Sequence, residues 1–169
     1  MDRYYYLITQ LPMLDFNSIE HIDIDYFIEQ AAKWLSPKDF EIFKRASIDD
    51  IYLRKSDNGI IKEYKTFEYN LRDDIVKFRE GNIGAILDES LKSVLADTDP
   101  LKVEMGLLRF KWSFVNKLES YHNFDLERVI IYLYKLQILD RISQFDKEKG
   151  EELFYKISNI NYEAMVHEN

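Results

Sequence analysis

The sequence has no cysteine, and it has only 5 glycines and 3 prolines among its 169 residues. Without cysteine there is no disulfide, thiolate metal site or thiol nucleophile, and the cytoplasm is the compartment that we expect. The scarcity of glycine and proline argues against disordered or low-complexity tracts. We predict a single domain over residues 1–169, because a chain of this length can bury a sufficient hydrophobic core without disulfide bonds.

The sequence also has fewer basic than acidic residues. The chain carries 23 Lys and Arg against 31 Asp and Glu, a net charge of -8. A surface of this sign is unfavourable for phosphate backbones, so we expect no nucleic-acid binding. The longest apolar run, Val129 to Tyr134, is far below the roughly 18 residues of a bilayer span, and the first residues do not resemble a secretory signal. We therefore predict no direct membrane insertion.

What the sequence does have is helical periodicity, with apolar residues recurring every three or four positions. This pattern predicts an all-α, compact domain of about seven helices, over residues 4–11, 25–35, 37–55, 64–78, 86–95, 100–120 and 125–145. A further amphipathic segment follows Gly150. The breaks at residues 81–84 and 97–100 are where the chain would divide if it contained two units.

The two longest C-terminal helices have distinctive patterns. The helix at 100–120 has two apolar stripes on nearly opposite sides, one containing Trp112 and the other Phe110, which predicts a helix sandwiched between two layers. A broad basic lane and a narrow lane of Glu104 and Lys111 separate the stripes. The helix at 125–145 is apolar around most of its circumference and is expected to be central.

Local spacing predicts helix ends and solvated positions. Four residues are expected to act as helix N-caps: Asp23 or Asp25, Ser36, Asp99 and Asp125. Glu68 and Arg72, like Asp73 and Lys77, are four residues apart, which predicts ion pairs on a solvated face. The Asp49-Asp50 pair is interpreted as exposed helix positions.

No pattern points to catalysis. The sequence contains neither a phosphate-binding glycine loop nor the acid and histidine arrangement that a serine nucleophile needs, so we predict no enzymatic activity and no cofactor. Glu119 and His122 form one E-x-x-H half-motif of the kind that carboxylate-bridged metal bundles use in pairs. The alternative function is thus a metal- or small-ligand-binding bundle that uses Glu119 and His122, although a histidine at a helix end explains the motif more simply.

Four basic residues are the candidate partner contacts: Arg72, Arg109, Lys135 and Arg141. Arginine offers a planar fork that matches carboxylates and is enriched at interfaces. A charge on the predicted central helix, as at Lys135 and Arg141, must also find an acid if it is partly buried. For Arg109, which lies in the broad basic lane, a solvated strip is the competing interpretation.

Three stretches resemble a known family: Tyr4 to Pro12, Asn70 to Asp74, and Asp99 to Gly150, the last with Phe110-Lys111-Trp112 and Phe145-Asp146-Lys147-Glu148-Lys149-Gly150. The family is an uncharacterised group of bacterial proteins encoded among the subunits of V/A-type rotary ATPases. Its members look like a shortened ATPase C subunit. The resemblance implies a non-catalytic accessory subunit in ion transport, an adaptor between central stalk and membrane rotor.

That resemblance also implies partners and a location. The partners would be other rotary ATPase subunits, and the protein would be cytoplasmic and peripheral to the inner membrane through the ATPase. An assembly factor that leaves the mature ATPase is the alternative.

Overall fold

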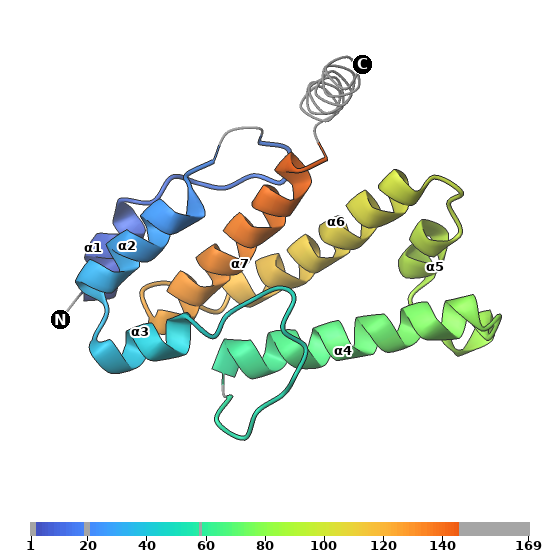
Figure 1. Cartoon of the computed structure of the whole chain (residues 1–169), viewed down its shortest axis with the longest axis horizontal. Helices are drawn as coiled ribbons and strands as arrows, with labels where there is room; N and C mark the ends of the chain where they lie inside the picture. The colour runs from blue at the N-terminus through green and yellow to red at the C-terminus, as the bar shows by residue number, and fades with distance from the viewer. Residues whose placement is uncertain (1–2, 19–20, 58, 146–169) are drawn as a thin grey trace, which may run out of the picture.

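The computed structural model describes residues 3–18, 21–57 and 59–145. Within these residues there are seven α-helices, one short 3-10 helix and no strands (Figure 1). The elements in chain order are α1 (Arg3–Thr9), α2 (Ile24–Trp34), α3 (Pro37–Phe43), α4 (Gly59–Arg79), η1 (Ile83–Ala85), α5 (Glu89–Leu95), α6 (Pro100–Glu119) and α7 (Leu126–Ser143). The prediction of an all-α, compact domain is confirmed. The segment predicted after Gly150 lies outside the described residues.

The predicted N-caps are present. The side chains of Asp23, Ser36, Asp99 and Asp125 each accept a hydrogen bond from a backbone N–H in the first turn of the helix that follows, which satisfies amides that have no partner within the helix. Asp23, and not Asp25, is therefore the N-cap of α2.

The central position of α7 is confirmed. Every residue from Val129 to Leu136 is buried, and α7 contacts α1, α2, α3, α4 and α6. Figure 1 shows α7 crossing the middle of the molecule, with the N-terminal helices on one side and α4 to α6 on the other. None of the described helices is both long and apolar enough to cross a bilayer.

Helix α6 presents two apolar faces, as predicted. Trp112 packs edge-on against Phe16, with ring centroids 5.7 Å apart, and lies in the main core beside α7. Phe110 instead stacks on Phe67 of α4 at 5.8 Å and packs against a second, smaller cluster built on Leu71, Ile86 and Leu91. The two rings thus point into different layers, and α6 is sandwiched between them.

The third predicted helix is much shorter than expected. It ends at Phe43 instead of near Lys55, and the following residues up to Asp57 form an irregular loop. Tertiary contacts compete with the helical hydrogen bonds there. The side-chain amide of Gln137 on α7 donates to the carbonyl of Ala46 at 3.0 Å and accepts from the N–H of Ile48 at 2.8 Å. Ala46 and Ile48 are both buried, so the loop is fastened to α7.

Gly106 marks the closest approach of α5 and α6. A Cβ atom at this position would lie 2.5 Å from Cγ1 of Val94, too close for two carbon atoms. We predict that Gly106→Ala lowers the free energy of unfolding by about 1–2 kcal/mol, because overpacking outweighs the better helix propensity of alanine. In a Val94→Ala background the same change should stabilise by up to about 1 kcal/mol. Urea denaturation of the four proteins measures both effects, and stabilisation in both backgrounds would contradict the packing argument.

Candidate functional site

Glu68 joins helices α4 and α6 by ion pairs. Its carboxylate accepts from Nε of Arg72 at 2.8 Å and from Nζ of Lys111 at 3.1 Å. Only 2% of the Glu68 side chain is exposed, so the prediction that it lies on a solvated face is wrong. The stacking of Phe67 on Phe114, with centroids 4.0 Å apart, turns this part of α4 toward α6. Asp73 and Lys77 do pair on the surface as predicted, at 2.7 Å.

An open cleft of about 460 Å³ lies beside this ion pair, between α4, α6 and the end of α7. Its apolar lining consists of Ile48, Leu71, Ile75, Val76, Leu107 and Leu108. Its charged lining consists of Asp49, Glu68, Arg72, Arg79, Glu104, Lys111 and Arg141. The carboxylate of Glu68 is buried, whereas the side chains of Arg72 and Arg141 are 46% and 49% exposed. The cleft therefore combines an apolar lining with an exposed rim that carries guanidinium groups and the carboxylates of Asp49 and Glu104.

A buried lysine holds one wall of this cleft in place. Nζ of Lys65, on α4, donates to Asp50 and Asp57 at 2.9 Å and to the carbonyl oxygen of Tyr52 at 3.0 Å. These three bonds use all three protons of the ammonium group. Asp50 is thus an anchor within a loop and not the exposed helix position that was predicted. Because Asp49 precedes it directly, the Lys65 contacts also position the cleft wall.

The pKa values of the two aspartates reflect this arrangement. The hydrogen bond from Lys65 lowers the pKa of Asp50, assisted by the N–H of Tyr52. Burial alone would raise the pKa of Asp57, but hydrogen bonds from Lys65 and from the N–H of Arg54 outweigh it and leave this pKa below its usual value. Both aspartates are therefore held in the charged form.

The structure brings two of the four predicted partner residues together. Arg72 and Arg141 line the same cleft, and Arg141 pairs with Glu104 at 3.4 Å. Arg109 lies elsewhere, with its guanidinium 4.3 Å from the centroid of the Phe16 ring and a hydrogen bond to Asn17 at 3.3 Å. It is therefore engaged by residues of its own chain.

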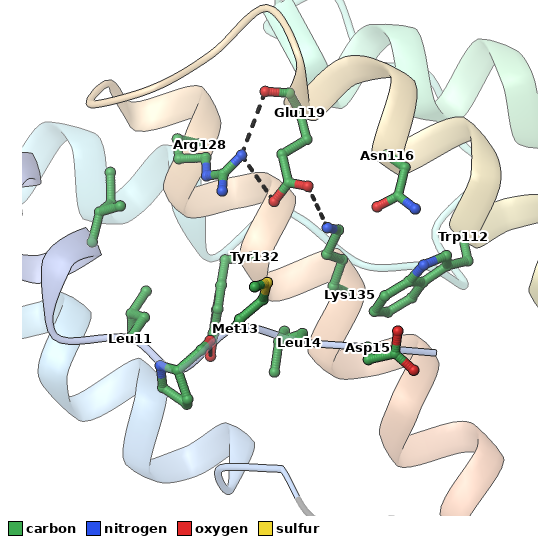
Figure 2. Close-up of a pocket in the computed structure, with 12 residues that line it drawn as sticks. Leu11, Met13, Leu14, Asp15, Trp112, Asn116, Glu119, Arg128, Tyr132 and Lys135 are labelled. Atoms are coloured by element: carbon green, nitrogen blue, oxygen red, sulfur yellow. Dashed lines mark hydrogen bonds and ion pairs between the residues drawn. The ribbon is translucent and has the colours of Figure 1, made fainter. Parts of the chain in front are cut away.

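Lys135 lies in a second cavity, between α6, α7 and the N-terminal segment (Figure 2). Its ammonium pairs with Glu119 at 2.5 Å and lies 5.1 Å from the centroid of the Trp112 ring. The expectation that a partly buried charge on the central helix finds an acid is confirmed for Lys135, which pairs with Glu119; Arg141 also pairs with an acid, Glu104, but its side chain is exposed.

The E-x-x-H motif is divided between two clusters. The Glu119 carboxylate contacts Lys135 and Arg128, whereas His122 donates from Nδ1 to Asp125 at 2.8 Å. A set of possible ligand atoms within 4.8 Å of one another comes from His122, Asp125 and Glu127, without Glu119. Since Asp125 also caps α7 by accepting from the N–H of Arg128 at 2.8 Å, helix capping accounts for the position of this carboxylate.

Two further residues of the cleft, Arg79 and Lys111, were not among the predicted contacts. Lys111 and Glu104 form the narrow polar lane between the two apolar stripes of α6, and this lane faces the cleft. This lane was therefore the sequence feature that could have indicated Lys111 as a residue of the cleft. For Arg79, at the end of α4, the sequence offers no comparable signal.

We predict that Lys65→Met destabilises the protein by about 3–5 kcal/mol, because it leaves Asp57 buried without a counter-charge. Lys62→Met, an exposed change on the same helix, is the matched control and should shift stability by less than about 0.5 kcal/mol. Urea unfolding measures both variants. Equal stability of the two would show that the Lys65 contacts do not hold the loop.

The same contacts predict sensitivity to acid. Because the folded-state pKa values of Asp50 and Asp57 lie below the unfolded value of about 3.9, their stabilisation is complete above that pH and is lost as the pH falls through the folded values. Unfolding free energies between pH 5 and pH 2 should fall less steeply for Asp50→Asn than for the parent. The exposed Asn70→Ala, which removes no titratable group, serves as control and should retain the parental slope.

Comparison with known proteins yields one family. The family described as "Protein of unknown function (DUF2764)" matches residues 68–164, which is more than half of the chain and includes α5, α6, α7 and most of α4. Neither the curated proteins nor the solved structures provide a match. From the extent of the family match, the chain belongs to the DUF2764 family.

Proposed function

We propose that this protein is a non-catalytic accessory subunit of a bacterial V/A-type rotary ATPase, an adaptor between the central stalk and the membrane rotor. Two things support the proposal. The first is the resemblance of three stretches of the sequence to proteins encoded with such ATPases. The second is the observation that carries the proposal: Arg72 and Arg141, 69 positions apart in the sequence, line one open cleft.

The chemistry of the cleft suits an acidic amphipathic helix of a partner subunit. Apolar side chains such as Leu71, Ile75 and Leu107 can accept the apolar face of a helix. The guanidinium groups at the rim can pair bidentately with carboxylates on its flanks. Four basic and three acidic residues line the cleft, so its charge is more favourable to an acidic partner than that of the whole chain, which is -8.

The existing ion pairs at the rim do not block such a partner. Arg141 and Glu104 are separated by 3.4 Å, and both side chains are at least one-third exposed. Exposed pairs of this kind contribute about 0–1 kcal/mol, so exchanging one carboxylate for another costs little. Arg79 forms no ion pair with any residue between 3 and 145 that the structure describes. Arg79 and Arg141 can therefore bind a partner without breaking the buried contacts of Glu68, while Arg72 bonds Glu68 through Nε alone and has its other guanidinium N–H groups to offer.

The remaining architecture is compatible with an adaptor. Tethering two assemblies requires rigid helices and complementary surfaces, and the described part of the chain consists of packed helices. The charged residues that are most deeply buried there, Lys65, Glu68 and Lys135, all form ion pairs within the chain.

We predict that the tagged full chain co-purifies with other ATPase subunits under mild detergent, and that Arg72→Ala/Arg141→Ala lowers the recovery at least tenfold. Recovery should fall by this factor if each of the two arginines forms an ion pair with a carboxylate of the partner subunit. Lys33→Ala/Lys38→Ala removes the same charge from the exposed surface of α2 and α3 and should leave the recovery unchanged.

The result also separates a resident subunit from an assembly factor. A resident subunit is recovered with the complete ATPase, whereas an assembly factor is recovered only with incomplete complexes. If the parent protein recovers no ATPase subunit, the proposed function is wrong.

A further inference from the structure

The N-terminal segment encloses a cavity of about 450 Å³ against α6 and α7 (Figure 2). Leu11 and Leu14 line it with apolar side chains, as do the rings of Trp112 and Tyr132, whereas Met13 at its lining is 93% exposed. The hydroxyl group of Tyr132 donates to the carbonyl oxygen of Pro12 at 3.0 Å, which fixes the segment across α7. The cavity is separate from the cleft that contains Arg72 and Arg141, because the two have no lining residue in common.

One end of this cavity is cationic. The carboxylate of Glu119 accepts from Nη1 of Arg128 at 2.8 Å with one oxygen and from Nζ of Lys135 at 2.5 Å with the other. Two cations thus share a single carboxylate. The remaining acid of the lining, Asp15, is exposed and accepts from the N–H of Asn17 at 2.8 Å.

The donors at this end exceed the acceptors. An ammonium group has three protons to donate, but among the described residues Lys135 has Glu119 as its sole hydrogen-bond acceptor. Its side chain is only 6% exposed, so bulk water has little access. Arg128 uses only Nη1 in its contacts with Glu119, which leaves the rest of its guanidinium without an acceptor in the described part of the chain. Burial accordingly lowers the pKa of Lys135, and the hydrogen bond to Glu119 opposes that shift.

We propose that the cavity binds a small monocarboxylate with an apolar tail. Its carboxylate accepts hydrogen bonds from Lys135 and Arg128, and its tail lies against Trp112 and the N-terminal segment. A single negative charge matches the one positive charge that Glu119 leaves uncompensated. A doubly charged phosphate would instead face Glu119 with an excess of negative charge.

Two sources can supply this chemistry. A free medium-chain acid and the C-terminal carboxylate of a polypeptide ending in an apolar residue both combine one carboxylate with adjacent apolar surface. Arg128 offers a planar fork to either, so the experiment has to distinguish them.

Fluorescence of Trp112 provides the measurement. In the full chain with Trp34→Phe, Trp112 is the only tryptophan, and its ring lines the cavity. We expect octanoate to change its emission saturably and to bind at least tenfold more tightly than octanol, which has the tail without the charge. A saturable response to octanol of equal affinity, or no response to any probe, would overturn the proposal.

Variants test the named contacts. Lys135→Met and Arg128→Gln should each weaken octanoate binding at least tenfold while leaving octanol binding unchanged. Arg141→Gln, on the same helix but lining the other cleft, should retain parental affinity. Circular dichroism establishes that each variant is folded. If folded Lys135→Met and Arg128→Gln both bind octanoate like the parent, the proposed site is wrong.

A second pair of probes identifies the source of the carboxylate. N-acetyl-Leu-Leu with a free C-terminus is compared with its C-terminal amide. Tighter binding of the free peptide than of octanoate supports a polypeptide terminus, and the reverse order supports a free acid. Equal binding of the peptide and its amide, together with no binding of octanoate, would contradict both proposed sources of the carboxylate. If the cavity binds none of these probes, the co-purification with ATPase subunits is unaffected, because that experiment depends on Arg72 and Arg141.

Discussion

The burial of α7 on nearly all sides is the constraint on which the rest of the structure depends. A helix with so little polar surface has to be covered, and α1, α2, α3, α4 and α6 supply the cover. Lys135 and Gln137, two polar side chains near its middle, then help to determine which segments lie where, because a buried polar group without a partner is costly. Gln137 forms hydrogen bonds with the loop at Ala46 and Ile48, and Lys135 forms one with Glu119 on α6.

The candidate cleft depends on a second set of buried charges. Lys65 holds the loop that contains Asp49, and Glu68 holds α4 against α6 through Lys111. These groups are out of solvent, whereas the guanidinium groups of Arg72 and Arg141 reach the rim. The exposed pair of Arg141 and Glu104 can exchange partners at little cost, whereas Arg72 also contributes to the buried contacts of Glu68 through its Nε.

Helical periodicity was sufficient to predict the helical elements, the opposed faces at Trp112 and Phe110, and the caps at Ser36 and Asp125. It was insufficient where the decisive partner lies far away in the sequence. The pattern around residue 68 indicated only the local pair with Arg72, because spacing within one helix carries no information about Lys111, 43 positions away. The irregular loop after Phe43 escaped prediction for the same reason, since Gln137 and Lys65 hold it in place.

The two candidate sites share the α6–α7 pair but use different parts of it. Asn116, Glu119 and Lys135 face the cavity, while Glu104, Lys111 and Arg141 face the cleft. Coupling between the sites would require two arrangements of α6 and α7 with different affinities for a ligand. Besides the ion pairs of Lys135, Arg128 and Arg141, these helices contribute Leu108, Val115 and Leu139 to the main core, all nearly inaccessible to solvent, and close-packed cores resist small displacements. We therefore expect the cavity and the cleft to bind independently of each other.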